Sequence, residues 1–118
     1  MLELGLVGTE MVYHAVGELG LEGGICVTAS HNPKEYTGMK IVRRGALPVG
    51  GDSGLDDVRR RAEQGFGDVG HRGEVRAEDV WDGFVDKVVS FVDPERIGPL
   101  KVVVDAANGM AGTMLPPV

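Results

Sequence analysis

The sequence predicts an α/β fold in which a mixed or parallel sheet is flanked by helices. Two short apolar runs of strand length, residues 24–27 and 101–104, are separated by segments in which apolar residues recur at helical spacing. Nineteen glycines in 118 residues lie between these segments without a fixed period. This distribution suits many short turns between strands and helices, and it excludes collagen-like and repeat architectures.

In the first half of the chain, we expect a strand at residues 4–7 and a helix over residues 10–19. Thr9 is placed to cap this helix, and Gly20 is placed to end it. A buried strand follows at residues 24–28, and another strand at residues 39–42. The apolar face of the expected helix consists of Met11, Val12, Ala15, Val16 and Leu19.

In the second half, a loop over residues 45–54 leads into a helix that starts at Ser53 or Gly54 and runs through Ala62. A polar loop covers residues 65–73. Residues 78–92 carry the longest helical stripe, which consists of Val80, Trp81, Phe84, Val85, Val88, Val89 and Val92.

The chain then breaks at residues 93–99, where prolines stand at both ends. Residues 101–104 predict a buried strand, and Asn108-Gly109 turns out of it. We expect no further element before residue 118.

Length and composition bound the class of protein. A chain of 118 residues is long enough for one ordinary domain. The net charge of −6 argues against a nucleic-acid partner, and the absence of a long apolar run argues against a membrane span. The first residues lack the pattern of a signal peptide. The single cysteine, Cys26, is expected to be a buried, inert thiol, and a reducing cytoplasm suits this composition.

Residues 28–33 read Thr-Ala-Ser-His-Asn-Pro and directly follow the expected strand at 24–28. Asn32 is a good helix N-cap, Pro33 suits the first helical position, and Glu35 can complete a capping box. The pattern therefore predicts a short helix up to residue 37. Ser30 would lie where a strand ends and a helix begins, a place that favours a bound anion.

The hexapeptide, followed by residues 35–41, Glu-Tyr-Thr-Gly-Met-Lys-Ile, resembles the phosphoserine loop of the α-D-phosphohexomutases. Within that family it is most similar to the phosphomannomutase/phosphoglucomutase branch. Residues 6–13 resemble the preceding strand and helix of the family, and residues 101–109 resemble the start of its second domain. The resemblance covers about a quarter of a full family member. It implies an incomplete first domain at residues 1–92, a linker at 93–99 and the first elements of a second domain at 100–118.

The resemblance implies an isomerase that moves a phosphoryl group between O6 and O1 of mannose or glucose phosphates. By the same resemblance, Ser30 would carry the phosphoryl group, and a hexose 1,6-bisphosphate would be the intermediate and activator. His31 and Asn32 would contact substrate or phosphate, and Lys40 would assist proton transfer or stabilise charge. Mg²⁺ would be bound through the phosphate on Ser30, but the family's Asp-Gly-Asp-x-Asp-Arg string of metal ligands does not occur in this sequence.

Each of these residues also has a simpler interpretation. Ser30 and His31 can be turn or surface residues beside a cap, Asn32 is sufficiently explained as the cap, and Lys40 can be a solvated lysine on a strand. The adjacency of His31 to Ser30 argues against a Ser-His-Asp triad, and no Gly-x-Ser-x-Gly elbow surrounds the serine. His14 and His71 have no partner pattern and are expected at the surface. Arg59, Arg60 and Arg61 are expected on a solvated helix face.

Two alternatives to a phosphomannomutase or phosphoglucomutase stay open. One is a phosphoglucosamine mutase, which is disfavoured by Thr28 before Ala29-Ser30 and by residues 36–40. The other is a non-catalytic, sugar-phosphate-binding remnant. Because the metal string and the sugar-recognition parts of the family are missing, we expect these 118 residues to be a fragment without activity of their own. The oligomeric state is left open.

Overall fold

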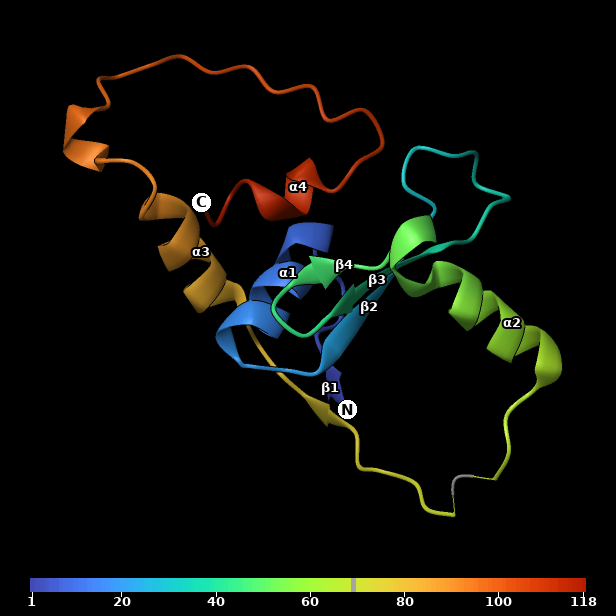
Figure 1. Cartoon of the computed structure of the whole chain (residues 1–118). Helices are drawn as coiled ribbons and strands as arrows, with labels where there is room; N and C mark the ends of the chain where they lie inside the picture. The colour runs from blue at the N-terminus through green and yellow to red at the C-terminus, as the bar shows by residue number, and fades with distance from the viewer. Residues whose placement is uncertain (69) are drawn as a thin grey trace.

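A computed structural model describes residues 1–68 and 70–118; Val69, inside the loop expected over residues 65–73, lies outside the described residues. The described part contains a three-stranded antiparallel sheet in the order β2-β3-β4 and a parallel pair β1-β5. Helices flank both (Figure 1), so the expected α/β class is confirmed. The elements are β1 (Leu2–Glu3), α1 (Thr9–Glu18), β2 (Gly23–Val27), β3 (Met39–Arg43), β4 (Leu47–Pro48), a π-helical turn (Gly51–Leu55), α2 (Asp56–Gln64), β5 (Arg76–Ala77), α3 (Trp81–Val89), a 3₁₀ turn (Pro94–Arg96) and α4 (Ala111–Met114).

Helix α1 packs on one face of the β2–β3 hairpin and places its expected apolar residues there. Val12 and Val16 are buried against the sheet together with Val42 of β3. Gly24 makes this close approach possible, because a Cβ at that position would stand 2.8 Å from Val12 Cγ1 and 2.9 Å from Val16 Cγ2. Leu19 does not join this face, since the helix ends at Glu18 and the Leu19 side chain is 46% exposed.

A second apolar cluster joins α1 to α3. Met11 and Ala15 of α1 pack with Val80 and Phe84, and all four side chains are buried. Burial of such side chains is the main favourable contribution to the stability of a small domain. Partly buried residues surround the cluster: Leu4, Val7, Trp81, Val88 and Met114.

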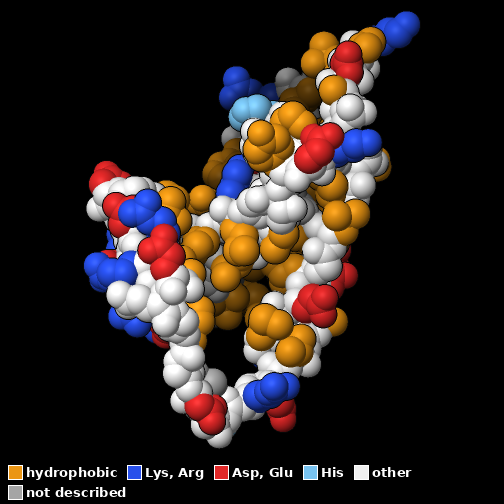
Figure 2. Space-filling model, turned by 90° about the vertical axis from the view of Figure 1, so that its right-hand side faces the viewer, with side chains coloured by type: hydrophobic (Ala, Val, Ile, Leu, Met, Phe, Trp, Pro, Cys, Tyr) orange, Lys and Arg blue, Asp and Glu red, His pale blue; other side chains and the backbone are white. Residues whose placement is uncertain are grey.

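The rest of the chain extends away from this centre. In Figure 1, α2 projects to one side, and the segment between the 3₁₀ turn and α4 runs in a wide arc. No residue of α2 is buried, and hydrophobic side chains are widely exposed on the face shown in Figure 2. The radius of gyration is 17.4 Å, above the approximately 13 Å of a compact domain of about 100 residues.

Several expected elements differ in the structure. The strand expected at residues 4–7 is at Leu2–Glu3, and the helix expected over 78–92 is confined to Trp81–Val89. The N-cap of α1 is Gly8, with Thr9 already inside the helix. Strand β2 is covered on one face only, since Ile25 and Val27 on its other face are 59% and 69% exposed. The short elements β4, β5 and α4 have too few residues to show a period in the sequence.

Two larger predictions are wrong. No helix follows Asn32. Between Asn32 and Gly38, the only backbone hydrogen bond of a turn among the described residues is donated by Tyr36 N to Pro33 O, at 3.0 Å. Five residues between Asn32 and Gly38 are too few to form a stable helix without tertiary support. Residues 101–104 form no strand and are exposed, because no strand lies beside them in the described part of the chain.

None of the helices in the described part combines the length and the apolar content that crossing a membrane requires.

Candidate functional site

The serine loop, residues 28–38, connects β2 to β3 as the tip of an antiparallel hairpin. The strand register pairs Val27 with Met39 and Cys26 with Lys40. The hairpin continues one bond further, since Thr28 N donates to Gly38 O at 2.9 Å. Glycine is required at 38, because a Cβ there would stand 2.9 Å from Thr28 O. The base of the loop is therefore tied to the sheet, while its tip is exposed.

Ser30 occupies the left-handed region of backbone conformation, with φ of 55°. This conformation costs a residue with a Cβ about 1–2 kcal/mol, and such positions often occur at functional sites. The Ser30 N–H donates to Thr28 Oγ1 at 3.0 Å, which compensates part of this cost. The Ser30 side chain is thereby held on the exposed side of a turn.

His31 and Asn32 make further contacts within the same turn. Ser30 Oγ and His31 Nδ1 are 3.3 Å apart, at the long end of hydrogen-bond distances. Asn32 donates to Ala29 O twice, from its backbone N at 3.0 Å and from Nδ2 at 2.8 Å. Asn32 therefore closes a turn in place of capping a helix. The sequence argument from adjacency did not foresee that His31 could reach the hydroxyl of Ser30.

Lys40 stands on β3 directly opposite Cys26, which gives the two side chains the same sheet face. The N-terminal end of α1 lies at this face, where Thr9 Oγ1 and Cys26 Sγ are 4.0 Å apart. Cys26 is half-buried there. Among residues 1–68 and 70–118, no hydrogen bond or ion pair joins Lys40 to the loop, and Lys40 is exposed.

The structure thus brings together Ser30, His31 and Asn32 and leaves Lys40 two residues beyond the loop. The positive end of a helix dipole is still close to the base of this loop, but it belongs to α1 and not to a helix after Asn32. An exposed hydroxyl on a fixed turn, with an imidazole within reach and a lysine on the adjoining strand, can accept and donate a phosphoryl group.

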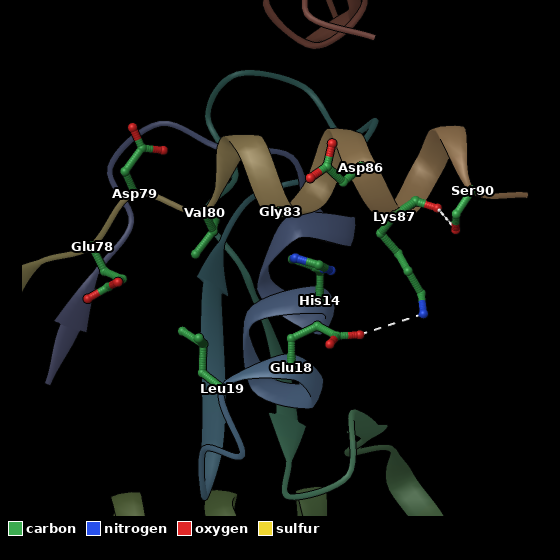
Figure 3. A pocket seen from close by; sticks show the side chains of 10 residues that line it. All are labelled: His14, Glu18, Leu19, Glu78, Asp79, Val80, Gly83, Asp86, Lys87 and Ser90. Atoms are coloured by element: carbon green, nitrogen blue, oxygen red, sulfur yellow. Dashed lines mark hydrogen bonds and ion pairs between the residues drawn. The ribbon is translucent and has the colours of Figure 1, made fainter. Parts of the chain in front are cut away.

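A separate pocket of about 430 Å³ lies between α1 and α3 (Figure 3). His14 was expected at the surface but is half-buried, and its ring meets Phe84 edge-on at 5.7 Å between centroids. Glu18 Oε1 lies 3.6 Å from Lys87 Nζ across the two helices. The spacing of His14 and Glu18, four residues apart on one helix, is the only sequence signal for this pocket. Its remaining residues are Leu19, Glu78, Asp79, Val80, Gly83, Asp86 and Ser90.

The two other surface expectations are confirmed. His71 is exposed, and the arginines of α2 form a solvated face with ion pairs at i, i+3 spacing. Arg59 lies 3.4 Å from Asp56, and Arg60 lies 2.7 Å from Asp57. Such exposed pairs add little to stability.

The described residues do not by themselves form a metal site. No group of three or more His, Cys, Asp or Glu side chains is gathered closely enough within the described part of the chain to hold an ion. A hard cation such as Mg²⁺ prefers several oxygen ligands. The residues present here therefore do not fit a complete magnesium site.

Comparison with known proteins shows the family to which this sequence is similar. Residues 1–65 match the family described as "Phosphoglucomutase/phosphomannomutase, alpha/beta/alpha domain I". A phosphomannomutase of Salmonella montevideo is 46% identical, and one of Escherichia coli K12 is 44% identical. The "Phosphohexose mutases" protein of Xanthomonas campestris strain B100 is 39% identical.

Each of these alignments covers 98% of this chain but only 26% of the relative. The chain therefore spans about a quarter of the length of the curated relatives it matches. The family match contains the whole serine loop, both strands that hold it and helix α1. On this match and these identities, the chain belongs to the phosphoglucomutase/phosphomannomutase family.

Proposed function

We propose that this chain carries the phosphoryl-transfer loop of a phosphohexomutase, an isomerase that interconverts hexose 6-phosphate and hexose 1-phosphate. Mannose and glucose phosphates are the proposed substrates, since the relatives from Salmonella and Escherichia coli are named phosphomannomutases. The observation that carries the proposal is the exposed Ser30 at φ of 55°, whose N–H bonds to Thr28 Oγ1 in a turn that Asn32 closes through Ala29 O.

In the proposed reaction, Ser30 begins as its phosphate ester. O1 of a hexose 6-phosphate attacks the phosphorus, the new O1–P bond forms, and the Oγ–P bond breaks. The proton of the O1 hydroxyl ends on Ser30 Oγ. The resulting hexose 1,6-bisphosphate then turns around in the site.

In the second half, Ser30 Oγ attacks the phosphorus at O6, the Oγ–P bond forms again, and the O6–P bond breaks. The proton of Ser30 passes to O6. The product is hexose 1-phosphate, and Ser30 again carries a phosphoryl group. Added hexose 1,6-bisphosphate would phosphorylate Ser30 by the same second half, which is why we propose it as an activator.

The neighbouring residues have separate proposed roles. His31 Nδ1, 3.3 Å from Ser30 Oγ, orients the hydroxyl, and Asn32 keeps the turn closed through Ala29 O. Lys40 supplies positive charge or a proton from the adjoining strand β3. Charge compensation of this kind is the main requirement of phosphoryl transfer.

Mg²⁺ stays a proposal for the longer protein. Its carboxylate ligands are not gathered among the described residues, and this chain would supply only a phosphate oxygen on Ser30. We place residues 1–92 in the first domain, 93–99 in a linker and 100–118 at the start of the second domain of a cytoplasmic enzyme.

The test is to identify the residue that carries the phosphate. Full-length protein is incubated with glucose 1,6-bisphosphate, and the peptide that carries Ser30 is fragmented in a mass spectrometer. We expect one added phosphate on Ser30. Phosphate on Thr28 or Thr37 instead, or on no residue of the loop, would contradict the proposal.

A second measurement concerns the 118-residue chain alone. We expect negligible conversion of mannose 1-phosphate or glucose 1-phosphate, with Mg²⁺ and bisphosphate present, because this chain spans about a quarter of its relatives' length and its described residues gather no metal site. Substantial turnover by the isolated chain would mean that the active site lies elsewhere in these residues.

A further inference from the structure

Thr28 is the link between the rigid sheet and the left-handed turn at Ser30. Its backbone N–H is fixed by the bond to Gly38 O at 2.9 Å, the last rung of the β2–β3 hairpin. Its side-chain Oγ1 accepts the Ser30 N–H at 3.0 Å. One residue therefore bonds to the strand opposite and to the serine that follows it by two positions.

We propose that Thr28 is a positioning residue for phosphoryl transfer, which sets the direction of Ser30 Oγ by holding the Ser30 amide. The inference rests on the proposed function of Ser30. Threonine suits this role because its branched side chain is stiff at χ1, and its backbone is already fixed by the hairpin. The acceptor oxygen is therefore placed before the turn forms.

The bond matters because Ser30 itself has few other supports within the turn. The Ser30 conformation is unfavourable for a residue with a Cβ, and its side chain has only the 3.3 Å contact to His31 in the described part of the chain. The Asn32 bonds to Ala29 O close the turn without touching Ser30. Without Thr28 Oγ1, we expect the turn to remain but the direction of the Ser30 hydroxyl to vary.

The experiment uses four variants of the full-length protein, first freed of phosphate. Thr28→Val keeps the shape of the side chain and removes the acceptor. Thr28→Ser keeps the acceptor and removes the methyl group, and Thr28→Ala removes both. Thr37→Val is the matched control, because Thr37 is an exposed threonine at the other end of the same loop. The measurement is the rate at which glucose 1,6-bisphosphate phosphorylates Ser30, followed by mass spectrometry.

We expect Thr28→Val and Thr28→Ala to slow phosphorylation of Ser30 by about ten- to a hundredfold, the usual effect of a misplaced reacting group. Thr28→Ser should stay within about threefold of the wild type, and Thr37→Val should equal it. Thermal unfolding is recorded for each variant. If Thr28→Val unfolds early, the comparison of Thr28→Ser with Thr28→Ala decides, because these two differ by one oxygen atom.

Two results would overturn the inference. One is phosphorylation at the wild-type rate in Thr28→Val, and the other is equal slowing in Thr28→Ser and Thr28→Ala, which would assign the effect to the methyl group. Failure of the proposed function is recognised separately, since the wild-type protein itself would then carry no phosphate on Ser30.

Discussion

Two turns of this molecule share one backbone design, although they lie far apart in the sequence. In the serine loop, Thr28 Oγ1 accepts the N–H of Ser30 at 3.0 Å, and Ser30 has φ of 55°. Near the C-terminal end, Asp105 Oδ1 accepts the N–H of Ala107 at 2.9 Å, and Ala107 has φ of 45°. A side chain thus supports a left-handed residue two positions later in both turns.

The closing bond is also the same. Asn32 N donates to Ala29 O at 3.0 Å in the first turn, and Gly109 N donates to Ala106 O at 2.8 Å in the second. Both turns follow a short, largely apolar run, at residues 24–27 and 101–104. Local sequence is therefore sufficient to make the turn, whatever the turn is used for.

The difference lies in what the turn presents and in what supports it. The left-handed position holds a hydroxyl in the serine loop and only a methyl group at Ala107. The serine loop also rises from two paired strands, whereas residues 101–104 are unpaired and exposed in the described part of the chain. A turn of this design becomes a candidate for chemistry only where it carries a reactive side chain and also rises from paired strands that fix its position.

The largest expected effect comes from making the two turns alike at the central position. Ser30→Ala should remove the phosphate label and lower turnover of the full-length protein by about 10⁴-fold or more, because the proposed nucleophile is gone. Circular dichroism and thermal unfolding should change little, since the long contact to His31 is the only one that Ser30 Oγ makes within the described residues. Retained activity in this variant would remove the functional difference between the turns.

A smaller effect is expected at the strand beneath the loop. Lys40→Ala should lower turnover by about two to four orders of magnitude if Lys40 acts as an acid, a base or a charge at the phosphate. Lys40→Arg should recover little, since the guanidinium stays protonated and differs in shape. Steady-state rates of both variants provide the measurement. Near-normal rates in both would make Lys40 a solvated residue of β3.

The base of the serine loop can be disturbed without touching its reactive groups. Gly38→Ala would place a Cβ 2.9 Å from Thr28 O, so the last rung of the hairpin must shift. We expect the free energy of unfolding to fall by about 1–3 kcal/mol, with about a tenfold loss of turnover. Gly67→Ala is the matched control, because a Cβ there has no heavy atom within 4 Å among the described residues beyond its chain neighbours. Equal unfolding curves for the two variants would show that the base is not rigid.

The same comparison explains what could be predicted from the sequence. Helix α1 and strands β2 and β3 follow local patterns that tertiary packing reinforces, so Met11, Val12 and Val16 were correctly expected in the core. Val102 and Val103 have the same strand pattern but no neighbouring strand among the described residues, and their side chains are 70% and 88% exposed. The apolar pattern predicts the tendency of a segment to form a strand. Burial of that strand depends on a partner strand or helix that the segment itself does not encode.

At the candidate site, sequence identified the residues but not how they are held. Asn32 has the composition of a helix cap, yet its amide donates to Ala29 O, because Asn side chains serve turns as readily as helices. Nothing in the sequence indicates the left-handed conformation of Ser30, because glycine is the residue that usually marks this conformation. The contact between the Ser30 and His31 side chains depends on that conformation and was missed with it.

The smallest effect is expected at the second turn. The left-handed backbone conformation costs Ala107 about 1–2 kcal/mol, and glycine would remove this cost. Glycine also raises the entropy of the unfolded chain, at a cost of about 0.5–1 kcal/mol. Ala107→Gly should therefore stabilise the full-length protein by about 0.5 kcal/mol and leave phosphorylation of Ser30 unchanged. Urea unfolding measures the first quantity and mass spectrometry the second.

Ser30→Gly is the corresponding change in the first turn and completes the comparison. It should give a similar small gain in stability, because Ser30 has the same unfavourable left-handed conformation. It should also remove the phosphate altogether. The two glycine variants thus separate the backbone cost, which both turns share, from the hydroxyl, which only the serine loop has. A loss of phosphorylation in Ala107→Gly would mean that the two turns are coupled and that the second one supports the site.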